Sequence, residues 1–314
     1  MAITDNVRMT IKVCRLYYEE NMSQKEISAQ LGISRPQVSR LLAYARANNI
    51  VSIKINNPFV DEARLEQLLM AKYKLKDALV VNTDGASEKG KLEEFGRLAA
   101  DYLGACFSEN NRVGVMSGKT ISSVAWSIKR LEQKGLEFVP LVGGIGSAGV
   151  NYHANAIAQR FADCSSGSCY VLNAPVIVKS EESRNMLIKE PGIAKVLEKG
   201  KSCDVAIVGI GQIDISSTTA QAGAMSHNDI KILKEAGAVA SVCTSYINAK
   251  GELVHTELNR RSIGQTLEQL KNCKTIALAI GNRKVPSIKA ALLCGYIDVF
   301  ITDLETARAI MDEA

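Results

Sequence analysis

Hydrophobic positions along this chain follow different patterns before and after Pro58. In residues 1–57, apolar positions at helical spacing define two short helices joined by a tight turn around Gly32. From residue 58 onward, short apolar runs typical of buried strands alternate with stretches of helical periodicity. Because a chain of 314 residues usually folds as more than one domain, we expect a helical domain over residues 1–57 and an α/β domain over residues 58–314.

The longer part of the chain has the pattern of a mostly parallel sheet. Its apolar runs are nearly continuous, and helical stretches such as Leu92–Phe107 and Lys284–Leu293 lie between most of them. This alternation is typical of a Rossmann-like α/β fold with helices on both faces of the sheet, in which ligands bind beyond the carboxyl ends of the strands. The predicted strands are Ala78–Asn82, Arg112–Met116, Phe138–Val142, Cys169–Asn173, Asp204–Val208, Ala238–Val242, Thr275–Ile280 and Val299–Ile301.

The first 57 residues contain the signals of a helix-turn-helix. Ser23 and Glu26 match a capping box at the start of one helix, and Ser34 with Gln37 matches a second box with Pro36 in the first turn. Gly32 suits the left-handed turn between the two helices, and Ser28 is small where the helices must cross. After them, Ile50–Ile55 alternates like a short wing strand, and Phe59–Tyr73 returns to helical spacing, which suits either subunit pairing or packing on the next domain.

The second of these helices presents polar side chains on the face opposite its apolar residues. Glutamine can pair with adenine and arginine with guanine, while hydroxyl groups suit phosphate contacts. Residues 1–57 also hold eight Lys and Arg against four Asp and Glu, a net charge of +4 out of +5 for the chain, which favours a DNA operator over a solvated helical hairpin. The DNA-binding candidates are Ser23, Gln24, Ser34, Arg35, Pro36, Gln37, Ser39, Arg40 and Tyr44.

Four predicted strands end in glycine-rich turns, among them GVMSGKT at residues 114–120. A true P-loop would place its first glycine at Val113, so nucleotide hydrolysis is not supported. A strand that turns into a helix still offers free backbone N–H groups to an anion. With the turns at Gly143–Ser147, Gly209–Gln212 and Gly281–Lys284, this one predicts a small anionic ligand. The order GIGQID at residues 209–214 lacks the third glycine of the G-x-G-x-x-G pattern, so a dinucleotide cofactor is not expected.

The composition is that of an ordinary globular protein, with 46% hydrophobic and 23% charged residues. The eight cysteines form no C-x-x-C pair and lie apart from the three histidines, so we expect reduced thiols and no metal site. No apolar run approaches the roughly 20 residues of a membrane helix, and the charged N-terminus has no signal-peptide core. We therefore expect a cytoplasmic protein with no membrane partner.

Several long motifs resemble those of SorC-family bacterial transcriptional regulators. They are LYYEENMSQKEISAQLGISRPQVSRLL in the first 57 residues and, in the remainder, VPLVGG, DVAIVGIGQID, LNRRSIG, the G-x-x-K at Gly281–Lys284 and AALLCGYIDVFITDLETARAI. The resemblance covers essentially the whole chain. It implies an effector domain of the sugar-phosphate isomerase, glucosamine-phosphate deaminase and CoA-transferase type. It also implies a phosphorylated sugar as effector, no cofactor, and a homodimer or homotetramer, typically a repressor of carbohydrate genes, on a palindromic operator.

The same resemblance assigns ligand-binding residues. Around the phosphate it implies Ser117, Gly118, Lys119, Thr120, Gly143, Gly144 and Lys284, and on the sugar side it implies Gly209, Gly211 and Gln212. Val142 occupies a position that is often basic in relatives, and Lys119 is our candidate for the missing charge. Ser241 replaces a frequent carboxylate, for which Asp214, Tyr246 or Asn248 could compensate.

An enzyme with an attached DNA-binding domain is the alternative. It would require an acid or base beside the sugar carbons, and the candidates are Asp214, His227, Asp229 and His255. A helix cap explains Asp214 and His227, and a solvated loop explains His255. Because the family's carboxylate position is a serine, we predict a regulator without catalytic residues.

Overall fold

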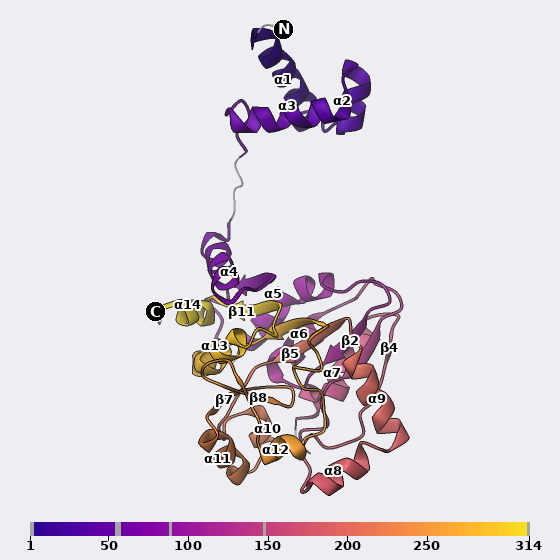
Figure 1. The fold of residues 1–314 in the computed structure, drawn as a ribbon, viewed down its shortest axis with the longest axis vertical. Coiled ribbons are helices and arrows are strands. Elements are labelled where there is room, and N and C mark those ends of the chain that lie inside the picture. Colours follow the sequence, from indigo (N-terminus) through magenta and orange to yellow (C-terminus); the bar gives the residue numbers. More distant parts are fainter. Residues whose placement is uncertain (1–2, 54–57, 88–89, 147–148, 313–314) are drawn as a thin grey trace. The chain divides into compact units, whose positions relative to one another are not determined.

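The computed structural model describes residues 3–53, 58–87, 90–146 and 149–312 (Figure 1). It divides into two compact units, Met1–Pro58 and Phe59–Ala314. The helices and strands of each unit carry the labels of Figure 1. Within the described ranges, no helix combines the length and the apolar character that crossing a membrane requires.

The first unit consists of three helices, α1 (Ile3–Tyr18), α2 (Gln24–Leu31) and α3 (Arg35–Ala47). The side chain of Ser23 accepts a hydrogen bond from the backbone of Glu26, and the Glu26 carboxylate accepts one from the backbone of Ser23, so the first predicted capping box is present. Their shared core consists of Val13, Cys14, Leu16, Ile27, Val38, Leu41, Leu42 and Ala45.

The turn between α2 and α3 has the geometry that its sequence predicts. Gly32 has a φ of 65°, the left-handed conformation that glycine adopts at low cost. The hydroxyl of Ser28 donates to the carbonyl of Ile33 at 2.6 Å and ties α2 to the turn. In contrast, the Ser34 side chain makes no capping hydrogen bond, so the second predicted capping box is wrong.

The predicted wing strand does not appear in the residues that can be assessed. Residues 50–53 form bends and irregular backbone rather than a strand, and residues 54–57 lie outside the described ranges. Ile50 and Val51 instead pack against the core of the first unit.

The second unit is built on a seven-stranded sheet with the strand order β1-β11-β10-β5-β2-β3-β4, in which every pair is parallel. The strand order reverses between β5 and β2, which are neighbours in the middle of the sheet. The strands are β1 (Asp77–Val81), β2 (Arg112–Val115), β3 (Glu137–Pro140), β4 (Ser168–Cys169), β5 (Val205–Gly209), β10 (Lys274–Leu278) and β11 (Val299–Asp303). The prediction for Cys169–Asn173 is wrong beyond Cys169, because residues 170–173 leave the ladder.

Helices cover both faces of this sheet. On one face, α5 (Lys91–Ala105), α6 (Lys119–Ser127) and α7 (Ala154–Asp163) bury a core that includes Phe95, Phe138 and Phe161. The other face packs against α4 (Val60–Tyr73), α9 (Pro191–Lys201), α13 (Val285–Leu293) and α14 (Leu304–Asp312). The remaining helices are α8 (Glu181–Leu187), α10 (Thr218–Gln221), α11 (His227–Glu235), α12 (Glu257–Arg260) and the short 3₁₀ segments η1 (Val150–Tyr152) and η2 (Asn282–Lys284).

A second, antiparallel sheet has the order β6-β7-β8-β9. Its strands are β6 (Gly211–Gln212), β7 (Ala238–Val242), β8 (Ser245–Asn248) and β9 (Leu253–Val254). The sequence correctly predicts a strand at Ala238–Val242, but its expected place in the parallel sheet is wrong. Alternate residues of β7 are only partly buried, as in a strand with one covered face, whereas β5 is buried almost throughout.

Candidate functional site

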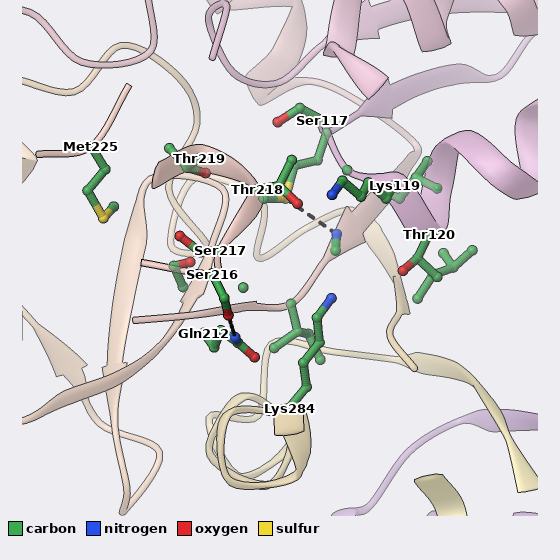
Figure 2. A pocket seen from close by; sticks show the side chains of 18 residues that line it. Ser117, Lys119, Thr120, Gln212, Ser216, Ser217, Thr218, Thr219, Met225 and Lys284 are labelled. Atoms are coloured by element: carbon green, nitrogen blue, oxygen red, sulfur yellow. Dashed lines mark hydrogen bonds between the residues drawn. The ribbon is translucent and has the colours of Figure 1, made fainter. Parts of the chain in front are cut away.

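A cavity of about 90 Å³ lies beyond the carboxyl ends of β2, β5 and β10, three neighbouring central strands (Figure 2). It therefore opens at the point where the strand order reverses, the usual ligand position in open α/β sheets. Since a single water needs roughly 10–15 Å³ of such volume, the cavity has room for a compact polar ligand. Its lining residues are Met116, Ser117, Gly118, Lys119, Thr120, Ile121, Gly209, Ile210, Gly211, Gln212, Ser216, Ser217, Thr218, Thr219, Met225, Ser241, Leu278 and Lys284.

The turn from β2 into α6 forms one wall of the cavity. Gly118 precedes the helix with a φ of 156°, and its N–H donates to the Tyr152 carbonyl at 2.9 Å. The helix hydrogen bonds begin with the N–H of Ser122, which donates to the Gly118 carbonyl. The N–H groups of the first turn of α6 have no partner inside the helix, and they favour an anion at this end.

Two lysines bring positive charge to the cavity. The Lys119 ammonium donates to the side chain of Gln221 at 3.3 Å and lies 5.6 Å from the centre of the Tyr152 ring. Among the described residues, the Lys284 ammonium has no hydrogen-bond or ion-pair partner. Burial, together with the nearby charge of Lys119, lowers the pKa of Lys284 from its ordinary value of 10.5. Among the residues that the structure describes, no carboxylate lines this cavity, so an anionic ligand would relieve the repulsion between the two lysines.

A polar segment from Gln212 to Thr219 forms the wall that faces Lys284. The Gln212 amide nitrogen donates to an Asp214 carboxylate oxygen at 3.0 Å and to the Ser216 hydroxyl. The same Asp214 oxygen accepts from the backbone N–H and the hydroxyl of Ser216, each at 2.7 Å. Burial raises the pKa of Asp214, but these hydrogen bonds outweigh it and hold that pKa below its ordinary value.

The third wall comes from the antiparallel sheet. Ser241 on β7 lies opposite Gly211 on β6 in the strand register. A Cβ atom at Gly211 would lie 2.5 Å from the Ser241 hydroxyl oxygen, so a side chain at this position would require the hydroxyl to turn away. The wall is therefore formed by a glycine backbone against a serine hydroxyl.

In the first unit, α3 presents a polar face to solvent. Arg35, Pro36, Gln37, Ser39, Arg40 and Tyr44 are all exposed, as are Ser23 and Ser34, while Gln24 is partly buried. Neither Arg35 nor Arg40 forms an ion pair with a carboxylate in the described part of the chain. The Nε of Arg40 donates to the Pro36 carbonyl at 3.4 Å, and the remaining guanidinium nitrogens of the two arginines are available to phosphates or guanine bases.

Comparison with known proteins identifies both parts of the chain. Residues 57–312 match the family model described as "Putative sugar-binding domain", and residues 12–48 match the model for Sigma-70, region 4. The deoxyribonucleoside regulator of Bacillus subtilis is 33% identical, over 98% of this chain and 98% of that protein. The sorbitol operon regulator of Klebsiella pneumoniae is 28% identical, over 99% and 100%. The chain belongs to the SorC family of transcriptional regulators.

Solved structures agree with this placement in the SorC family. The full-length sorbitol operon regulator SorC from Klebsiella pneumoniae matches with a TM-score of 0.75 and 28% identity, over 97% of this chain and 98% of that one. A DeoR family transcriptional regulator from Listeria monocytogenes matches with a TM-score of 0.74 and 33% identity, over 79% and 99%. Our predictions of the fold, of a sugar-responsive DNA-binding regulator and of a protein that is not an enzyme are confirmed.

The cavity of this SorC-family chain brings together eight of the eleven predicted ligand-binding residues. Gly143, Gly144 and Asp214 are not among the residues that line it. A Cβ at Gly143 would lie 2.5 Å from the Ala174 carbonyl, so that glycine serves the close approach of two backbones. The Val142 side chain is buried in the core, and Lys119 and Lys284 are the charges that reach the cavity.

None of the four candidate catalytic residues lines the cavity. Asp229 forms a capping box with Ser226 and an ion pair with Arg261 at 2.6 Å, which gives it a structural role. His227 begins α11, and His255 is exposed. Within the described ranges, no cluster of three His, Cys, Asp or Glu residues could hold a metal, and the eight cysteines are free thiols.

Sequence reasoning did not name the hydroxyl-rich segment Ser216–Thr219, or Met116 and Met225, as part of the site. The run of four hydroxyl side chains that begins one residue after GIGQID was the available signal. The Met116 sulfur lies 3.3 Å from the backbone nitrogens of Gly209 and Cys243, a contact between the two sheets that no local motif encodes.

Proposed function

We propose that this SorC-family regulator binds a phosphorylated sugar in the cavity at the carboxyl ends of β2, β5 and β10, and that this binding changes its affinity for an operator. We assign DNA binding to residues 1–57 and effector binding and oligomerisation to residues 58–314. The likeness to regulators of deoxyribonucleoside and sorbitol genes supports a carbohydrate effector. We further propose that the protein acts in the cytoplasm as a repressor.

The positive charge of the cavity is the observation that supports a phosphate group on the effector. In the described residues, Lys119 and Lys284 line the cavity without any carboxylate, and Lys284 is partly buried and has no partner there. The first turn of α6 adds backbone N–H groups, and Ser117 and Thr120 add hydroxyls. A neutral sugar would leave the repulsion between the two ammonium groups in place, whereas a phosphate would neutralise it.

We propose that the protein works as a homodimer or homotetramer. An operator read by paired recognition helices requires at least two copies of the first unit. Exposed apolar side chains on α4, Val60 and Leu68, are candidates for contact between copies. Light scattering of the full-length chain would test this, and a monomer at working concentrations would contradict it.

A thermal-shift panel of sugars and their phosphates, with the full-length chain, tests the effector. We expect stabilisation by at least one sugar phosphate and none by the corresponding free sugar, because only the phosphate pairs with the two lysines. Lys284→Ala should abolish the shift. Lys195→Ala, which removes an exposed lysine on α9 away from the cavity, should retain it. A shift that survives Lys284→Ala, or that free sugars give equally, would contradict the proposal.

A further inference from the structure

Asp214 is a carboxylate beside the cavity, but it does not line it. It lies between Gln212 and Ser216, and one of its oxygens accepts three hydrogen bonds from these two residues. That oxygen is therefore occupied by protein donors. The sequence suggested that Asp214 binds sugar hydroxyls directly. This geometry does not favour that role.

The hydrogen bonds around Asp214 fix which way the Gln212 amide points. A carboxylate can only accept, so the Ser216 hydroxyl gives its single hydrogen to Asp214 and can only accept from a third group. The Gln212 group that faces both must be its NH₂, because an amide oxygen there would meet two acceptors. Both amide hydrogens of Gln212 are thus donated to Asp214 and Ser216, in the same wall of the cavity.

The opposite end of the same amide is available to a ligand. Figure 2 shows the Gln212 nitrogen directed toward Ser216 and its oxygen pointing away from it, on the side of Lys284. In the described residues no donor reaches this oxygen, and Gln212 lines the cavity together with Lys284. The cavity therefore combines two cationic donors with one side-chain acceptor whose direction is fixed.

We propose that Asp214, acting with Ser216, is a positioning residue that holds the Gln212 amide with its oxygen toward the effector, and so selects anions that carry a hydroxyl group. A hydroxyl can donate to this oxygen, whereas an alkyl group would leave it unpaired and a second phosphate would place acceptor against acceptor. This inference rests on the proposed binding of a phosphorylated ligand and adds the chemistry that distinguishes one such ligand from another.

Binding of two simple phosphates to the full-length protein tests the proposal by calorimetry. Glycerol 3-phosphate carries two hydroxyls on the three-carbon chain that propyl phosphate leaves bare, and inorganic phosphate serves as the reference. We expect the wild type to prefer glycerol 3-phosphate about fivefold, the factor that one neutral hydrogen bond contributes. Gln212→Leu should remove the preference without weakening the binding of propyl phosphate.

The role of Asp214 is tested by three variants and a control. Asp214→Ala frees the amide and should bring the preference close to one, while Asp214→Asn, which keeps an acceptor oxygen, should restore it. Ser216→Ala removes one anchor of the amide and should lower the preference even if Asp214→Ala fails to fold. Ser180→Ala removes a helix-capping hydroxyl on α8, outside the cavity, and should keep the wild-type preference.

The outcomes separate this inference from the proposed function. If Asp214→Ala weakens both phosphates by one common factor, or leaves the preference intact, the residue is only structural and the inference is overturned. Equal binding of the two phosphates by the wild type would also overturn it, while the phosphate site itself would stand. If the wild type binds none of the three phosphates, the proposed function fails and this inference fails with it.

Discussion

Of the residues that line the cavity, Lys284 has the electrostatic environment that says most about the charge of the ligand. Burial and the charge of Lys119 both disfavour its ammonium form, which lowers its pKa below 10.5. Within the described part of the chain, no carboxylate lines the cavity to balance this positive charge. A lysine in such surroundings gains most from an incoming anion, because the anion stabilises the form that the empty cavity destabilises.

The first prediction at the residue scale concerns pH. A bound phosphate raises the pKa of Lys284, so binding above the lowered pKa requires proton uptake, and affinity falls as the pH rises through that pKa. Calorimetry with a sugar phosphate should follow this decline in a range where a phosphate monoester is already doubly ionised, from about pH 7 upward. Lys119→Ala removes the repulsion and should move the decline to higher pH. An affinity independent of pH up to 10.5 would argue against Lys284 as a ligand.

A second residue-scale prediction concerns Gln37 on the exposed face of α3. Gln37→Ala should lose about 1–3 kcal/mol of discrimination at one base pair, because a bidentate contact to adenine would be lost. The readout is a comparison of operator variants selected from random DNA. Gln67→Ala, an exposed glutamine on α4, is the matched control. A uniform loss across unrelated sequences would instead mean that Gln37 contacts only phosphate.

At the scale of elements, the contact between α5 and α6 depends on one glycine. A Cβ at Gly96 would lie 2.4 Å from the Ser123 carbonyl oxygen, which belongs to the backbone of α6. At Gly104, on the same helix, a Cβ would meet only the end of the Leu131 side chain at 3.2 Å. Substitutions at the two positions therefore distinguish the effect of helix packing on stability from the effect of helix propensity.

We predict that Gly96→Ala destabilises the second unit by about 1–3 kcal/mol, because α6 must move away from α5. Gly104→Ala should be neutral or stabilising by up to about 1 kcal/mol, since alanine is the better helix former and Leu131 can adjust. Denaturant unfolding of the full-length chain measures both changes. Equal effects of the two substitutions would show that the close approach at Gly96 is not what limits stability. Because α6 carries Lys119, Gly96→Ala should also weaken effector binding.

The elements themselves were largely predictable because their signals are local. Capping residues and Gly32 define α2, and continuous apolar runs define β2, β5 and β10. The errors arose where distant partners decide the outcome. Ala238–Val242 is a strand in either sheet, and its partners β6 and β8 place it in the antiparallel one. Similarly, the glycines at 143 and 144 suggest a ligand loop, yet Gly143 is required by the backbone of Ala174.

At the scale of the whole molecule, the regulator is a pair of linked binding equilibria. If the effector changes the operator affinity by some factor, the operator must change the effector affinity by the same factor. We expect this factor to fall between about 5 and 150. Titrating the sugar phosphate with and without operator DNA, and the operator with and without the sugar phosphate, should give one value. Two different values would mean that the effector site and the measured DNA complex do not belong to the same equilibrium.

The contact between Gly211 and Ser241 has a consequence for how this cavity changes over evolutionary time. A side chain at 211 would force the γ atom of residue 241 to turn aside, so we expect substitutions at the two positions to be coupled. A longer carboxylate in place of Ser241 should be accommodated best while residue 211 is glycine. A lineage that first enlarges residue 211 should accept that exchange less readily. The order of substitutions, and not only their sum, thus influences which effectors descendants of this protein can come to recognise.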